Sequence, residues 1–341
     1  MKLSIAICTY NGASYLQEQL DSFLWQTRLP DEIVVCDDCS QDETVEILKK
    51  FAAKSPFPVH IHVNKTNLGL TGNFDNAISR CTGDIIFLSD QDDVWLPERL
   101  EKFEAAFERD ADVGLVFCDA YLVDEKLESL NCRNWETVGF NSKFQEMFIE
   151  GGSFPILLYH NVISGFSMAF RAEYKKLISP IPDDLNLLIY DHWIGILLSS
   201  VSKLGLVTEP LVKYRQHSKQ QIGARASSFD YSSKSVFQPY SFKNFFQRFG
   251  VQYPLNHILE RLEAIQEHIR AMPDGREIYK TVLTDIAPHI AHLHSRTKIQ
   301  KGLHNHFLVV MKELLARRYH RYSNGLGSAV KDLFSVGRRF N

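Results

Sequence analysis

Three carboxylates within four residues, Asp90, Asp92 and Asp93, directly follow the largely apolar run 85–89. Carboxylates this close raise one another's pKa unless something positive lies between them. The apolar run predicts a buried strand, and open α/β sheets bind ligands at the carboxyl ends of their strands. The simplest positive partner is a hard divalent cation, which often shares a diphosphate as co-ligand. The pattern indicates a metal-dependent enzyme acting on a nucleotide diphosphate; the alternative is an acidic cap on the helix expected from Pro97.

Two other expected strand ends carry polar groups. Asp37 and Asp38 end the apolar run that starts at Ile33, and residues 9–12 (Thr-Tyr-Asn-Gly) follow the run 3–8. Adjacent acids at a strand end can accept hydrogen bonds from a base or a ribose, or they can simply shape a turn. Three polar strand ends in succession are a more specific signal of a ligand site than any one of them.

Strand and helix signals alternate through the first 120 residues. Strands are expected at 3–8, 33–36, 59–63, 85–88 and 114–118, and helices at 16–24, 44–51, 73–80 and 97–107. Further along, 165–171, 204–207 and 211–214 have strand character, the last two separated by Pro210, and 190–201 has helix character. This alternation predicts an α/β fold with a mixed, mainly parallel sheet and helices on both faces.

The length and composition set the domain organisation. The chain has 341 residues, of which 45% are hydrophobic and 23% charged, as in ordinary globular proteins. We expect two domains, 1–225 and a mainly helical 226–341. The net charge of −3 argues against nucleic acid as a partner. Six cysteines without a spaced framework, no signal peptide and no long apolar stretch predict reduced thiols and a cytoplasmic location.

The end of the chain is basic and amphipathic. Residues 296–341 carry ten Lys or Arg and only two acids, Glu313 and Asp332, with apolar residues interleaved between 307 and 315. A basic amphipathic helix of this kind can lie on an anionic bilayer, which predicts a peripheral location at the inner face of a bacterial cytoplasmic membrane. The alternative is a basic face packed on the protein or on a second subunit of a homo-oligomer.

Together these segments resemble a known family. Residues 5–12 (IAICTYNG), 33–42 (IVVCDDCSQD), 67–69 (NLG) and 83–93 (GDIIFLSDQDD) follow one another in the order and at the spacing of family 2 glycosyltransferases. The resemblance covers residues 1–120 closely and extends more weakly to about residue 225. It implies the GT-A fold, in which a Rossmann-like sheet binds a nucleotide-diphospho-sugar.

The resemblance also implies roles for single residues. Thr9 and Asp38 would hold the nucleotide base, with Asn11 nearby. Asp90 would contact the ribose and help to hold the metal, Mn²⁺ or Mg²⁺. Asp92 would be the principal metal ligand, so that the ion screens the charge of the diphosphate.

Three further positions match the family less closely. Asp191 falls where the family places its catalytic carboxylate, although the residue before it is Tyr190 and not the usual Glu. Asn73 lies where many members carry an Ala-Arg-Asn triplet and here belongs to Gly-Asn-Phe. His217 follows a strand expected near the donor and could complete the metal site or contact the diphosphate. Asp191 is also compatible with a helix cap, and His217 with a surface loop.

The variant at 89–95 (SDQDDVW) and the segment 214–217 (YRQH) are most similar to bacterial rhamnosyltransferase-type members. This implies inverting transfer of a sugar to a growing O-antigen or capsule glycan, linked to a polyprenyl diphosphate. The donor would be deoxythymidine-diphosphate rhamnose or a uridine-diphosphate hexose. Two alternatives remain at this point: a nucleotidyltransferase, although residues 9–13 lack the usual basic residue, and a non-catalytic sugar-nucleotide-binding subunit.

Overall fold

The structure is a computed structural model that describes residues 1–183, 189–218, 220, 255–273, 275–300, 306–323 and 325–334. The chain separates into two compact units, residues 1–230 and 231–341. The domain boundary expected at 225/226 lies outside the described residues, so this part of the domain organisation stays a prediction.

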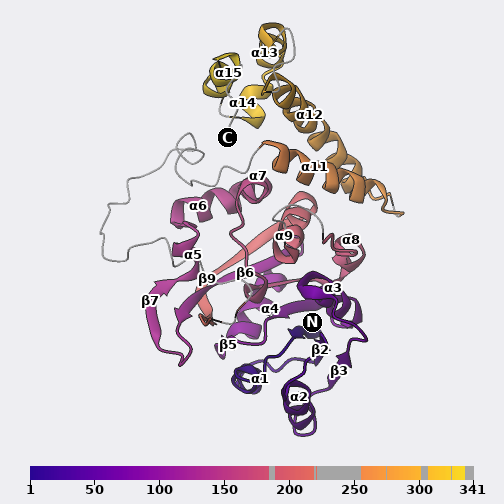
Figure 1. Cartoon of the computed structure of the whole chain (residues 1–341), viewed down its shortest axis with the longest axis vertical. Helices are drawn as coiled ribbons and strands as arrows, with labels where there is room; N and C mark the ends of the chain where they lie inside the picture. The colour runs from indigo at the N-terminus through magenta and orange to yellow at the C-terminus, as the bar shows by residue number, and fades with distance from the viewer. Residues whose placement is uncertain are drawn as a thin grey trace. The chain divides into compact units, whose positions relative to one another are not determined.

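Within the described residues, one nine-stranded mixed sheet forms the centre of the first unit (Figure 1). Its order is β3-β2-β1-β4-β8-β6-β9-β5, and β7 pairs with β6. The strands are β1 (Leu3–Thr9), β2 (Glu32–Asp37), β3 (Val59–Val63), β4 (Ile85–Ser89), β5 (Val94–Trp95), β6 (Val113–Val123), β7 (Ser129–Arg133), β8 (Met168–Arg171) and β9 (Lys203–Arg215). The first four strands pair in parallel, β8 is antiparallel to both β4 and β6, and β6 is parallel to β9.

Helices cover both faces of this sheet, as the sequence predicted. They are α1 (Leu16–Leu24), α2 (Thr44–Ala52), α3 (Gly69–Arg80), α4 (Arg99–Arg109), α5 (Asn134–Thr137), α6 (Ser142–Met147), α7 (Ser153–Tyr159), α8 (Lys175–Ile178) and α9 (Tyr190–Val201). All seven residues of β1 are buried, as expected for a strand covered on both faces. Alternate β1 residues, beginning with Leu3, pack in one core with α1, α2 and α4. α3 packs against β1 and β2, and α9 packs against α3.

One expectation was wrong in detail. The segments 204–207 and 211–214 were expected as two short strands, but they form one 13-residue strand, β9. Pro210 has no N–H to donate to the ladder, and the pairing with β6 shifts register around Asp119, the partner of Pro210. The strand therefore passes the proline by an irregularity in pairing and does not end there.

The second unit is helical in its described residues, in agreement with the expected helical C-terminal region. It contains α11 (Leu255–Arg270), α12 (Glu277–Gln300), α13 (His306–Leu315), α14 (Arg318–Tyr322) and α15 (Gly325–Phe334). Among the described residues of the chain, no helix is both long and apolar enough to cross a membrane.

Buried polar pairs join the helices of this unit. The guanidinium of Arg296 donates to both carboxylate oxygens of Asp332, at 2.6 and 3.1 Å, and Tyr319 donates to the same carboxylate at 2.8 Å. His292 and Glu313 lie 2.7 Å apart, and both are almost fully buried. Charges removed from water in this way stabilise a fold only while each partner is present.

We therefore expect Asp332→Ala to unfold the second unit selectively. Loss of the carboxylate leaves the Arg296 guanidinium buried without its partner, which costs about 3–5 kcal/mol. Hydrogen exchange of full-length protein should show faster exchange in peptides from α12 to α15 and unchanged exchange in β1 to β4. The matched control is Asp285→Ala, an exposed acid on α12, which should leave exchange unchanged. Equal protection in both variants would contradict the prediction.

Candidate functional site

The three polar strand ends lie at one edge of the sheet. β1 is parallel to β2 and β4, with Thr9 paired to Asp37 and Ile7 to Ser89. Their carboxyl ends therefore meet side by side, as the sequence predicted. The Thr9 hydroxyl donates to the Asp37 carboxylate at 2.7 Å, and the Asp38 N–H donates to the Thr9 carbonyl oxygen at 2.8 Å.

Asp38 holds the turn before α3. Its carboxylate accepts from the Asn64 amide at 2.8 Å, the Leu68 N–H at 2.7 Å and the Gly69 N–H at 2.9 Å. Asn73 is buried and donates to the Cys36 carbonyl oxygen at 2.9 Å. Both side chains thus shape the strand-end loops, and their roles in nucleotide binding stay predictions.

A glutamine that sequence reasoning missed fixes the acidic loop to the loop after β1. The Gln91 side chain accepts from the Tyr10 N–H at 2.9 Å and donates to the Tyr10 carbonyl oxygen at 3.1 Å. Gly12 makes room for it, because a Cβ there would lie 2.1 Å from the Gln91 Oε1. The same loop is shaped by Asn11, which has a φ of 48° and accepts from the Gln41 N–H at 2.8 Å.

The acidic loop concentrates negative charge in a partly dehydrated place. Removal from water, together with the charges of Asp92 and Asp191, raises the pKa of Asp90 to about 8. Asp93 is fully buried, and burial followed by repulsion from Asp92 and Asp90 raises its pKa well above its usual range. One Asp93 oxygen accepts from the Arg215 N–H at 3.2 Å.

The structure brings His217 to Asp92 from 125 residues away. The His217 Nε2 lies 2.8 Å from a carboxylate oxygen of Asp92, and both side chains are largely buried. Arg215, at the end of β9, supports this arrangement by donating to the backbone carbonyl oxygens of Asp92, at 2.8 Å, and Glu125, at 2.6 Å. Arg215 also pairs with the Glu18 carboxylate. Sequence reasoning included the YRQH segment but gave Arg215 no role.

The donor atoms fit a hard cation that relies on its substrate for further ligands. Asp90 and Asp92 offer carboxylate oxygens, and His217 offers an imidazole nitrogen. In the part of the chain that the structure describes, no group of three or more His, Cys, Asp or Glu is arranged to hold an ion by itself. Mg²⁺ and Mn²⁺ sites in nucleotide enzymes commonly use one or two carboxylates and complete their shell with phosphate oxygens and water. The pair of carboxylates therefore fits such an ion.

The predicted catalytic carboxylate, Asp191, lies in the first turn of α9. It accepts from the Gly165 N–H at 3.0 Å and from the Asn161 amide at 3.2 Å. Burial raises the pKa of Asp191 to about 6, although these hydrogen bonds oppose the shift. A carboxylate with a pKa near 6 is ionised at neutral pH and is a stronger base than an ordinary aspartate.

Tyr190 links Asp191 to the acidic loop. Its hydroxyl donates to an Asp90 carboxylate oxygen at 3.4 Å, and its ring stacks on Phe74 of α3 with centroids 4.0 Å apart. Gly165 allows this position, because a Cβ there would lie 1.8 Å from the tyrosine oxygen. Tyr190, the residue that departs from the family pattern, therefore packs on α3 and links α9 to the acidic loop.

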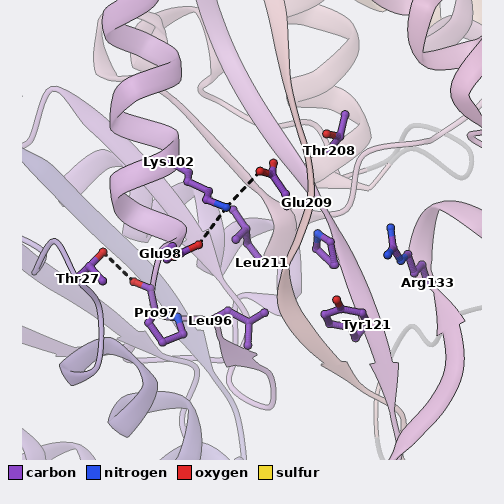
Figure 2. A pocket seen from close by; sticks show the side chains of 11 residues that line it. Thr27, Leu96, Pro97, Glu98, Lys102, Tyr121, Arg133, Thr208, Glu209 and Leu211 are labelled. Atoms are coloured by element: carbon purple, nitrogen blue, oxygen red, sulfur yellow. Dashed lines mark hydrogen bonds and ion pairs between the residues drawn. The ribbon is translucent and has the colours of Figure 1, made fainter.

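A cavity of about 630 Å³ lies elsewhere in the first unit, beside the middle of β9 (Figure 2). Its lining includes Tyr121, Arg133 and residues 208–211, and none of the predicted site residues. Lys102 in its wall is held between Glu98, at 3.0 Å, and Glu209, at 3.2 Å. The carboxylates predicted to bind a metal ion, Asp90 and Asp92, lie at a strand end and not in this cavity.

Comparisons with known proteins relate the first half of the chain to a family of enzymes. Residues 4–166 match the family model of glycosyl transferase family 2. An uncharacterized glycosyltransferase of Nostoc is 25% identical over 240 residues, which cover 69% of this chain and 71% of that protein. The putative glycosyltransferase EpsE of Bacillus subtilis is 35% identical over 124 residues, 36% of this chain and 45% of EpsE. Uncharacterized mycobacterial relatives are matched over 59% of their length.

Among solved structures, S. aureus TarS 1-349 superposes with a TM-score of 0.52 at 16% identity, covering 98% of this chain and 81% of that one. The complex of TarS 1-349 with UDP-GlcNAc gives a TM-score of 0.50 at 17% identity, covering 97% of this chain and 81% of that one. At this identity the likeness shows the fold alone.

The contact between Gly12 and Gln91 leads to a prediction. We expect Gly12→Ala to lower the free energy of unfolding of the first unit by about 1 kcal/mol, because the added Cβ displaces the Gln91 amide, which then loses its two hydrogen bonds with Tyr10. Urea unfolding monitored by circular dichroism measures the change. Gln91→Ala removes the obstacle, so the double variant should be more stable than the sum of the two single effects predicts. Additive effects would show that the two side chains do not compete for space.

Proposed function

We propose that this chain, whose residues 4–166 belong to glycosyl transferase family 2, is a metal-dependent inverting glycosyltransferase that uses a nucleotide-diphosphate sugar. The match to family 2 and the likeness of fold confirm the resemblance to family 2 glycosyltransferases with the GT-A fold, whereas transfer of rhamnose is part of the proposal. The observation that supports the activity most is that Asp90 and Asp92, directly after β4, lie near Asp191 in the first turn of α9, with His217 on Asp92. Intact acids in this arrangement favour a catalyst over a non-catalytic binding subunit.

The donor would bind across the carboxyl ends of β1, β2 and β4. Asp38 already accepts three hydrogen bonds of about four that a carboxylate can take, which leaves one acceptor position. The imide N–H of a uracil or thymine ring could fill that position, with Thr9, Asn11 and Asn73 shaping the surrounding loops. This keeps deoxythymidine-diphosphate rhamnose and uridine-diphosphate hexoses as the donors to test, and TarS has been crystallised with a donor of the second kind.

Asp90, Asp92 and His217 would hold Mn²⁺ or Mg²⁺ together with the diphosphate. When bound, the ion stabilises the negative charge that develops on the departing nucleoside diphosphate. Tyr190 and Arg215 keep the acidic loop in place through their contacts with Asp90 and with the Asp92 carbonyl oxygen.

Asp191 would act as the general base. Its carboxylate takes the proton of an acceptor hydroxyl while that oxygen forms a bond to the anomeric carbon. The bond between the anomeric carbon and the diphosphate oxygen breaks on the opposite side, which inverts the configuration. The hydrogen bonds from Asn161 and Gly165 hold the carboxylate in one orientation during the transfer.

The acceptor would be a growing O-antigen or capsule-type glycan on a polyprenyl diphosphate. What supports this is the basic end of the chain, which suits a peripheral position on an anionic membrane surface. The alternative role of this basic region would be to pack against a second copy of the chain in a homo-oligomer.

The first test is release of nucleoside diphosphate from a panel of nucleotide sugars with Mn²⁺, Mg²⁺ or a chelator. We expect slow hydrolysis of one donor that stops with chelator and falls by about 10²–10⁴-fold in Asp92→Ala. The exposed acid Glu108 on α4 provides the control variant Glu108→Ala, which should keep full activity. Metal-dependent binding without turnover, even with acceptor added, would instead favour the non-catalytic subunit.

The second test concerns the base. Because Asp191 acts as the carboxylate and its pKa is about 6, transfer should fall about tenfold per unit as the pH drops below 6. Asn161→Ala removes a hydrogen bond that favours the ionised form, so the acid limb should move to higher pH while the rate at high pH stays near normal. Asp191→Asn should reduce transfer by about 10²–10⁴-fold at every pH. Near-normal turnover of Asp191→Asn would remove Asp191 from the mechanism.

A further inference from the structure

The last helices of the chain expose large apolar side chains. On α13, Phe307, Leu308 and Leu315 are 62%, 64% and 81% exposed. On α15, Leu326 and Phe334 are 62% and 82% exposed. Scattered surface leucines are ordinary, but stripes of this size on two neighbouring helices call for a covering partner.

The two helices repeat one pattern at an offset of 19 residues. Phe307, Met311 and Leu315 correspond to Leu326, Val330 and Phe334, and these residues form the exposed stripes. In each helix the stripe is bordered by an exposed lysine, Lys312 or Lys331, at the equivalent position. The residue after each lysine is an acid that points into the unit: Glu313 and Asp332 are 2% and 1% exposed. α13 and α15 therefore present the same kind of surface, apolar with a basic border.

The buried acids decide the sign of the exposed charge. Glu313 pairs with His292 and Arg318, and Asp332 pairs with Arg296, so both are neutralised inside the unit. In the described parts of 296–334, every exposed Lys, Arg, Asp or Glu side chain is consequently basic. These residues are Lys298, Lys312, Arg317, Arg321 and Lys331.

We infer that the exposed stripes of α13 and α15, with Lys312 and Lys331 at their borders, form a docking surface for an anionic lipid bilayer. Apolar side chains of an amphipathic helix enter the boundary between headgroups and acyl chains, while lysines beside them attract anionic headgroups. A second copy of this chain fits less well. A two-fold symmetric contact would place the basic surface against itself, with no exposed acid in the described part of the segment to compensate. This docking surface would be the membrane contact of the proposed transferase, and only its biological purpose rests on the proposed function.

The test is co-sedimentation of full-length protein with phosphatidylcholine vesicles, with and without phosphatidylglycerol. We expect binding only to the anionic vesicles and weaker binding at high salt. The double variant Lys312→Gln/Lys331→Gln should bind about 20- to 30-fold more weakly, since each lysine near the surface contributes about fivefold. The triple variant Leu308→Ser/Leu315→Ser/Phe334→Ser should lose at least about tenfold.

Matched controls come from the first unit. Lys49→Gln/Lys50→Gln removes two exposed lysines of α2, and Trp25→Ser/Ile149→Ser removes two side chains that are 63% and 62% exposed. Both should bind vesicles like the unchanged protein. All of the substituted positions on α13 and α15 are on the surface, so we expect these variants to remain folded. Circular dichroism checks this.

Three results would overturn the inference: no binding of the unchanged protein to anionic vesicles, equal losses in the controls, or a dimer that the triple variant converts to monomer without any vesicle binding. Hydrolysis of nucleotide sugar in vesicle-free buffer separates this from the proposed function. Vesicle binding without release of nucleoside diphosphate from any donor, even with metal and acceptor added, would reject the transferase and keep the docking surface. Hydrolysis without vesicle binding would reject the docking surface alone.

Discussion

The first unit is organised around mutual repulsion between carboxylates that must stay close together. Removal from water, together with the charges of Asp92 and Asp191, opposes the ionisation of Asp90. Such a cluster would move apart if its loops were free to do so. Several contacts prevent this, among them the two hydrogen bonds between Gln91 and the Tyr10 backbone and the hydrogen bond from the Arg215 guanidinium to the Asp92 carbonyl oxygen. In the proposed transferase, a cation bound at these carboxylates would offset their repulsion and would attract the diphosphate of the donor.

The order of the strands in the sheet brings residues from later in the chain close to the ends of the first strands. β1, β2 and β4 place their carboxyl ends side by side, but Asp191, the proposed general base, and His217 come from later in the chain. β8 runs antiparallel between β4 and β6 and connects the two halves of the sheet. β9 then pairs with β5, directly after the acidic loop, so that its end delivers His217 to Asp92. The mixed sheet is therefore the means by which distant segments share one edge.

Much of this was predictable from the sequence, for identifiable reasons. Buried parallel strands are continuous apolar runs, so β1, β2 and β4 and their polar ends could be read directly. Asp92 and His217 were grouped through the family resemblance, and the structure places them in contact. The contacts of Gln91 and Arg215 depend on partners far along the chain, so they leave no periodic signal in the sequence. The glycine at position 12 is the one local sign that another side chain, Gln91, lies close to this loop. The continuity of β9 through Pro210 was missed for a similar reason, since a proline signals a break unless the partner strand shifts to accommodate it.

The two units handle acidic residues in opposite ways, and this follows from what surrounds each acid. In the first unit, Asp90 and Asp93 are removed from water near other carboxylates, so their ionisation is opposed. In the second unit, Asp332 is buried against Arg296 and Tyr319, so its charge is matched within the fold. Burying matched acids also removes negative charge from the surface, and the exposed lysines are left without local compensation. The polar core that holds the helices together therefore also sets the charge that the unit presents to its surroundings.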